Sequence, residues 1–145
     1  NLSDFLNMET FSWPVRVYYG DTDNGGVVYY ANYLKFMERA RTEWLRHLGF
    51  EQDELVRNES VIFAVRSAKI DYMRPALFND LLHVSAKVTA HGRASITFAQ
   101  EVVRAATADP QQSVLCLGEI KIACLDAKTM RPTPIPVRLL AELKQ

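Results

Sequence analysis

Two aspartates in a short glycine-rich turn are the residues of this chain whose types and spacing favour chemistry. Asp21 and Asp23 lie between Gly20 and Gly26, in a stretch that also holds an asparagine and a third glycine. An aspartate is ionised at neutral pH, so it can act as a nucleophile or as a general base. The turn therefore offers a carboxylate that could attack an electrophilic carbon or activate water.

A helix is predicted to begin just after this turn, at about Tyr30. The first N–H groups of a helix have no partner inside the helix and lie at the positive end of its dipole. A backbone N–H in this position can stabilise an oxyanion without a side chain. Gly25 and Gly26 permit the backbone to come close to a bound substrate. The turn and the helix start together supply a carboxylate and an oxyanion donor.

The same residues also have structural interpretations. Aspartates in turns often accept hydrogen bonds from turn amides, and we favour this role for Asp21. Asn32 is of a type that commonly caps helices. Glu38 is a further acidic group on the predicted helix, and we interpret it as one half of an exposed pair with Arg41, three residues along.

The period of the apolar residues predicts the elements that position the turn. Trp13-Pro14 opens a predicted strand in which Val15, Val17 and Tyr19 are apolar at every second position. Four further strands are predicted after the helix, and the first of them contains a phase change that indicates a bulge near Arg66-Ser67. These four strands span residues 61–72, 82–89, 96–102 and 114–125, with short helices at 51–59 and 137–144.

One long amphipathic helix is predicted from about Tyr30 to Leu48, where the apolar spacing changes to three and four residues. Gly49 follows, where a helix end favours a left-handed glycine. The apolar stripe of this helix consists of Tyr33, Met37, Ala40, Trp44 and Leu48.

Composition excludes several classes of function. The chain of 145 residues has 17 basic and 17 acidic side chains, which argues against a nucleic-acid-binding surface. No segment approaches the roughly 18 consecutive apolar residues of a membrane span. Cys116 and Cys124 lie in one predicted strand, too far apart for a disulfide, and no cluster resembles a metal site. We therefore expect free thiols, a cytoplasmic protein, and no metal or cofactor.

The predicted order is α+β: an antiparallel sheet with one apolar face and one long helix that can cover it. We expect residues 1–145 to form a single domain. A single sheet curled around one helix leaves edge strands exposed, and pairing of these edges would form a dimer.

The acidic turn and the helix start resemble a known family. The run from Tyr19 to Tyr30, YGDTDNGGVVYY, followed by Asn32-Tyr33 and the Glu38–Arg41 segment, is similar to the hotdog-fold acyl-CoA thioesterases. The resemblance is to the 4-hydroxybenzoyl-CoA thioesterase family and, within it, to the Tol-Pal-associated thioesterases. It implies a hotdog fold, in which the sheet wraps around the central helix, and a homodimer or homotetramer with active sites at the dimer interface.

The resemblance also implies residue roles. Asp23 would be the catalytic carboxylate, and the backbone N–H of Tyr30 would polarise the thioester carbonyl. Some relatives carry a histidine where this chain has Tyr30, but a backbone donor survives that change. The substrate would be a short-chain or aromatic acyl-CoA. Independently of the resemblance, we expect Gly26 and Tyr29 to lie beside the substrate, and Arg93, together with Arg66, Lys69 and Arg74, to meet the CoA phosphates.

Two other functions remain open at this point. A hotdog hydratase or dehydratase usually relies on a histidine beside an acidic residue, and no histidine precedes His47. A non-enzymatic or dual role, as a partner of acyl carrier protein, of a cell-envelope complex or of a lipid-synthesis assembly, is the second alternative.

Overall fold

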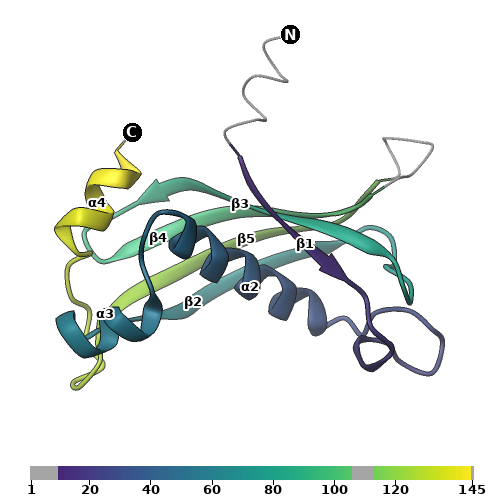
Figure 1. Ribbon diagram of the computed structural model, residues 1–145, viewed down its shortest axis with the longest axis horizontal. Coiled ribbons are helices and arrows are strands. Elements are labelled where there is room, and N and C mark those ends of the chain that lie inside the picture. Colours follow the sequence, from purple (N-terminus) through teal and green to yellow (C-terminus); the bar gives the residue numbers. More distant parts are fainter. Residues whose placement is uncertain (1–9, 106–112, 145) are drawn as a thin grey trace, which may run out of the picture.

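The computed structural model describes residues 10–105 and 113–144. Five antiparallel strands form one sheet in the order β1-β3-β4-β5-β2. Figure 1 shows the long helix α2 lying along one face of this sheet, with α3 and α4 gathered at one end of the molecule. The α+β architecture expected from the sequence is confirmed. The elements are β1 (Phe11–Arg16), η1 (Tyr19–Asp21), α2 (Asn32–His47), α3 (Gln52–Glu59), β2 (Val61–Tyr72), β3 (Leu81–His91), β4 (Ser95–Arg104), β5 (Val114–Asp126) and α4 (Val137–Leu143).

The apolar stripe of α2 packs on the sheet. Phe36, Met37 and Ala40 are fully buried and lie in a core to which all five strands contribute. A Cβ added to Gly118 of β5 would stand 2.7 Å from the Met37 sulfur, so a larger residue at this position would have to displace the end of the Met37 side chain. Gly49 has a φ of +95°, which confirms the left-handed helix end.

The first strand lies further upstream than predicted. β1 spans Phe11–Arg16 and pairs along its length with β3, ending where Arg16 faces Leu81. Tyr19 was expected on the buried face of this strand but lies in the turn η1 and is 80% exposed. Pro14 lies inside β1, where it is tolerated because β1 is an edge strand with a neighbour on one side only.

The other strands agree closely with the sequence pattern. The predicted bulge is confirmed, because the register between β2 and β5 shifts between Val65 and Ser67. In the part of the chain that the structure describes, no helix is long and apolar enough to cross a bilayer.

The predicted exposed pair of Glu38 and Arg41 is wrong. Arg41 is only 8% exposed and donates to the Gln100 Oε1 atom at 3.0 Å. Gln100 in turn donates from Nε2 to the carbonyl oxygen of Met37 at 3.0 Å and to that of Ser85 at 3.1 Å. This polar contact ties the middle of α2 to the centre of the sheet.

Candidate active site

The acidic turn is a small hairpin at the end of the molecule away from α3 and α4 (Figure 1). The Asp23 N–H donates to the Val27 carbonyl at 2.9 Å, and Thr22 and Val28 form an isolated β-bridge. The Tyr29 N–H donates to the Asp21 carbonyl at 3.0 Å. These contacts return the chain from the turn to the start of α2, so Asp23 and Tyr30 belong to one loop with a defined conformation.

The connection between β2 and β3 packs against this hairpin and is hydrogen-bonded to it. The Val28 N–H donates to the Ala76 carbonyl at 2.8 Å, and the Phe78 N–H donates to the Gly26 carbonyl at 3.2 Å. The Ala76 N–H is bound by the Tyr33 hydroxyl oxygen at 2.9 Å. Sequence reasoning missed this support, because Pro75 and the turn that follows indicate only where a strand ends.

The two aspartates have different partners. Asp21 uses both carboxylate oxygens: Oδ2 accepts from the Tyr18 N–H at 2.9 Å, and Oδ1 accepts from Asn32 Nδ2 at 3.3 Å. Asp23 uses one, because Oδ1 accepts from the Gly25 N–H at 2.8 Å. The Asp23 Oδ2 atom makes no hydrogen bond or ion pair with any residue in the described ranges. The Asp23 residue is exposed.

The helix start differs from the prediction by two residues. α2 begins at Asn32, and Tyr30 lies in the turn that precedes it. Asn32 does not cap the helix: the N-cap is Ala31, which makes no side-chain cap bond. Within the residues that the structure covers, the Tyr30 N–H has no hydrogen-bond acceptor. It is therefore available as a donor even though it stands just outside the regular helix.

Tyrosine rings surround this donor. The Tyr29 and Tyr30 rings are 4.7 Å apart, and Tyr72 of β2 lies edge-on to Tyr30 at 6.3 Å. The Tyr72 hydroxyl donates to the Tyr30 carbonyl at 3.2 Å. A hydrogen bond with the Tyr30 hydroxyl raises the pKa of Tyr29, and burial raises the pKa values of Tyr33 and Tyr72. These three hydroxyls stay protonated at neutral pH.

Gly26 lies in the acidic hairpin, whereas Arg93 lies at the opposite end of the sheet. Gly26 has a φ of +79°, a left-handed conformation that favours glycine, and forms the bend of the acidic hairpin. Arg93 follows the far end of β3, where its carbonyl accepts from the Ile135 N–H at 2.9 Å. The eleven residues of β3 separate it from the acidic turn by roughly 35 Å. One chain does not bring Arg93 to Asp23.

Neither cysteine is a candidate nucleophile. Cys116 and Cys124 are free and buried, as predicted. Burial raises the pKa of the Cys116 thiol to about 12 and that of Cys124 to about 11, so neither forms a thiolate at neutral pH. Over the described ranges, no group of three or more potential ligands could hold a metal ion.

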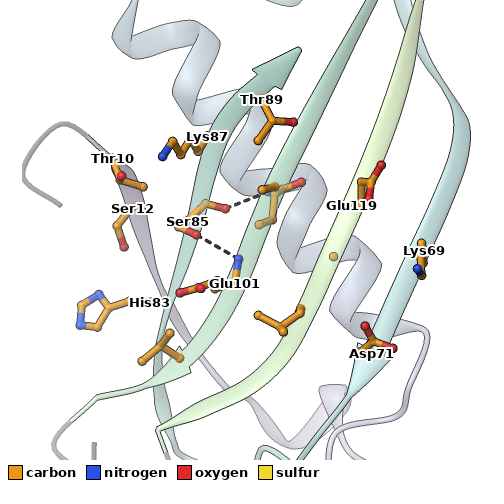
Figure 2. Close-up of a pocket in the computed structure, with 15 residues that line it drawn as sticks. Thr10, Ser12, Lys69, Asp71, His83, Ser85, Lys87, Thr89, Glu101 and Glu119 are labelled. Carbon is orange, nitrogen blue, oxygen red and sulfur yellow. Dashed lines mark hydrogen bonds between the residues drawn. The ribbon is translucent and has the colours of Figure 1, made fainter. Parts of the chain in front are cut away.

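A hollow of about 890 Å³ lies on the sheet face opposite α2 and does not include the acidic turn. Figure 2 shows its polar side chains projecting away from the helix, with contributions from every strand. The apolar residues Val103 and Leu117 lie among charged ones. The charged and ionisable side chains are Lys69, Asp71, His83, Lys87, Glu101 and Glu119.

Comparison with known proteins shows to which family the chain belongs. The model of the thioesterase-like superfamily matches residues 17–143, which include the acidic turn, the helix start and all strands except β1. The chain belongs to the thioesterase-like superfamily. The family resemblance inferred from the turn is confirmed, and the protein is a thioester hydrolase.

Its relatives in this superfamily are similar along nearly their whole length. The chain is 42% identical to the acyl-CoA thioester hydrolase YbgC of Escherichia coli over 140 residues, which is 97% of this chain and 100% of the relative. It is 44% identical to the acyl-CoA thioesterase YbgC of Haemophilus influenzae, covering 90% and 92%. The crystal structure of a probable thioesterase from Bartonella henselae matches with a TM-score of 0.78 at 32% identity, covering 88% of this chain and 99% of that one. This agreement confirms the hotdog fold.

Proposed function

We propose that the protein hydrolyses short-chain or aromatic acyl-CoA to the free acid and CoA, with Asp23 as the catalytic carboxylate. One observation carries the assignment: the same loop presents an Asp23 oxygen and a Tyr30 N–H that have no partner among the described residues. These are the two groups that thioester hydrolysis requires, a base or nucleophile and an oxyanion donor. The curated relatives, which are named as acyl-CoA hydrolases, support the substrate class.

Asp23 can act in either of two ways. As a general base it removes a proton from water, whose oxygen bonds to the thioester carbon. The resulting oxyanion then collapses, the C–S bond breaks, and the CoA thiolate takes the proton from Asp23. As a nucleophile, the carboxylate itself bonds to the carbon and expels CoA thiolate, and water then cleaves the anhydride. In both routes the Tyr30 N–H donates to the oxyanion.

The neighbouring residues then have binding roles. Gly26 keeps the bend of the hairpin free of a side chain, so the thioester can approach the backbone. The Tyr29 ring is 47% exposed beside the Tyr30 donor and offers an apolar wall for the acyl group. The structure is compatible with an aromatic or a short aliphatic acyl group at this wall.

A second copy of the chain would complete the site. Asp23 and Tyr30 are exposed on one chain, and β2 is an edge strand of twelve residues bonded only to β5. Its Val65 and Tyr72 side chains are 55% and 48% exposed. Antiparallel pairing of two β2 edges would extend the sheet and set the far end of one copy beside the acidic turn of the other. In such a dimer, Arg93 can reach a CoA bound at the acidic turn of the second copy.

The outer face of the sheet supports a further step to a homotetramer. Its hollow is lined by the apolar residues Val103 and Leu117 together with charges of both signs. In the described ranges, Lys69, Lys87 and Glu119 make no ion pair. A surface that carries charges of both signs, here two lysines and three carboxylates, can pair with a second copy of itself, and interfaces commonly combine apolar residues with polar ones.

We also place the enzyme in the cytoplasm, because two free cysteines suit a reducing compartment. Acyl carrier protein and cell-envelope proteins remain predicted partners.

A panel of acyl-CoAs of graded length, with benzoyl and phenylacetyl forms, tests the proposed activity. Hydrolysis should release one free thiol per substrate, detected with a colorimetric thiol reagent. Product formation without thiol release would instead indicate a hydratase or dehydratase. If no acyl-CoA releases thiol above the uncatalysed rate, the proposed function is wrong.

A further inference from the structure

Asp21 holds three parts of the active-site loop at once. Its Oδ2 atom accepts from the Tyr18 N–H at 2.9 Å, before the turn. Its carbonyl accepts from the Tyr29 N–H at 3.0 Å, after the turn. Its Oδ1 and carbonyl oxygens both accept from Asn32 Nδ2 at 3.3 Å, at the start of α2. The Asp21–Asn32 contact therefore closes the loop that carries Asp23 and Tyr30.

Asn32 also sets the direction of the Tyr30 donor. Its backbone N–H donates to the Tyr29 carbonyl at 2.9 Å. This carbonyl and the Tyr30 N–H belong to the same planar trans peptide, so they point in opposite directions. Because the carbonyl is fixed toward α2, the N–H is directed away from the helix, toward the side where a substrate can approach. Asn32 thus fixes this peptide through its backbone and the loop through its side chain.

The start of α2 is anchored without a conventional side-chain cap. A capping serine, threonine or asparagine binds the first free N–H groups of its own helix. Here the N-cap is Ala31, which has no such side chain, and Asn32 reaches back to Asp21. The loop is therefore anchored without a side chain occupying the Tyr30 N–H.

We propose that Asp21 and Asn32 form a clamp that positions the Tyr30 N–H and the Asp23 carboxylate for reaction. The clamp touches neither the substrate nor the reacting atoms, so both are positioning residues. This inference rests on the proposed thioesterase function and adds the pair that sets its geometry. It predicts that the donor–acceptor contact between positions 21 and 32 controls the rate, whichever residue carries the charge.

A charge-swap cycle tests the clamp. Asn32→Asp puts two carboxylates against each other, and we expect kcat to fall by about 10- to 100-fold, because small displacements of reacting groups cost this much. KM for acyl-CoA should stay within about twofold, because CoA is bound elsewhere. The double variant Asp21→Asn/Asn32→Asp restores an amide opposite a carboxylate and keeps an acceptor for Tyr18, but the carboxylate at position 32 cannot donate to the backbone carbonyl of residue 21. Its kcat should therefore recover severalfold over that of Asn32→Asp without reaching that of the unmutated enzyme.

Two controls separate positioning from folding and from charge. Asn24→Asp adds the same charge at an exposed position of the same turn, where the side chain makes no hydrogen bond within the described ranges, and should leave kcat unchanged. Circular dichroism at the assay temperature establishes that each variant is folded. Should Asn32→Asp fail to fold, Asn32→Ala removes the same side-chain contacts without repulsion and should lower kcat several-fold at unchanged KM.

The outcomes are distinct. If folded Asn32→Asp and Asn32→Ala keep full kcat, or if the swap fails to recover activity that Asn32→Asp has lost, the clamp is overturned while the thioesterase stands. If Asn24→Asp loses as much activity as Asn32→Asp, the effect is one of charge, which also overturns it. If the unmutated enzyme hydrolyses no acyl-CoA, the proposed function and the clamp fall together.

Discussion

At the scale of single residues, the acidic turn depends on backbone conformations that few residue types adopt. Gly26 holds a φ of +79° and accepts a hydrogen bond from the Phe78 N–H, while its own N–H donates to the Asp23 carbonyl at 3.1 Å. The position of Asp23 is therefore coupled to that of Gly26. The turn composition predicted such a bend, but it could not show which glycine makes it.

Gly26→Ala should weaken both folding and catalysis. A left-handed conformation costs a residue with a Cβ about 1–2 kcal/mol, so the free energy of unfolding should fall by that amount, with a lower kcat as the hairpin adjusts. Gly20→Ala is the matched control: its added Cβ meets no atom within 4 Å, and its φ is not left-handed. Urea unfolding of both variants measures the difference. Equal losses would show that the bend does not need Gly26.

The buried thiols predict how stability depends on pH. Burial raises the pKa of Cys116 to about 12 and of Cys124 to about 11, whereas the thiols of the unfolded chain ionise near about 8.5. Above that pH the unfolded chain binds fewer protons than the folded one, so the free energy of unfolding falls as pH rises. Below about pH 8.5, these thiols are protonated in both states and do not make the free energy of unfolding depend on pH.

Urea unfolding between pH 7.5 and pH 10 measures this slope. In a Cys116→Ala/Cys124→Ala variant the free energy of unfolding should fall less steeply as pH rises, because the two titrating groups are gone. An identical decline in both proteins would mean that other groups cause it.

At the scale of elements, the apolar period predicted α2 and four strands well, since these segments bury one continuous face. The same helical period also indicates that Arg41 is buried, because Arg41 lies four residues after Met37 on the side of α2 that faces the core. We did not predict this burial from the sequence, because arginine is ordinarily exposed. The bounds of β1 could not be predicted, because they follow from the extent of β3, which begins at Leu81 opposite Arg16.

Gln100→Leu should destabilise the packing of α2 on the sheet. It leaves the buried Arg41 guanidinium without its acceptor and the Met37 carbonyl without its extra donor. The loss of a hydrogen bond to a buried charged group predicts a fall of about 2 kcal/mol in the free energy of unfolding. The double variant Arg41→Met/Gln100→Leu should recover much of this loss. If the double variant is no more stable than Gln100→Leu, the pair is not coupled.

At the scale of the whole molecule, the candidate site is open on one chain, and the residue predicted to bind CoA phosphates lies at the other end of the sheet. The sequence could predict that Asp23 and Tyr30 lie in one loop, because they are close along the chain. It could not place Arg93, whose distance from them is set by the length and direction of β3. The prediction of one domain over residues 1–145 stays a prediction, because residues 1–9, 106–112 and 145 lie outside the described ranges.

The assembly can be tested with two complementary variants on the outer sheet face. Lys69→Glu/Lys87→Glu makes the face acidic, and Glu101→Lys/Glu119→Lys makes it basic, so like charges should hold each protein at the dimer stage. An equal mixture should form tetramers, measured by light scattering. Each dimer should keep its kcat, because this face does not include the acidic turn. An unmutated protein that is only dimeric contradicts the tetramer, and a monomer also contradicts pairing through β2.

The kcat of Asp23→Asn on one good acyl-CoA tests the central claim most directly. The change keeps the shape of the side chain and an acceptor for the Gly25 N–H but removes the charge. We expect kcat to fall by about 100-fold or more, the scale of a lost general base, with KM and melting temperature nearly unchanged. Asp23→Asn that keeps most of its kcat, while Glu38→Gln or Asp21→Asn abolishes activity, would contradict the assignment of Asp23 as the catalytic carboxylate.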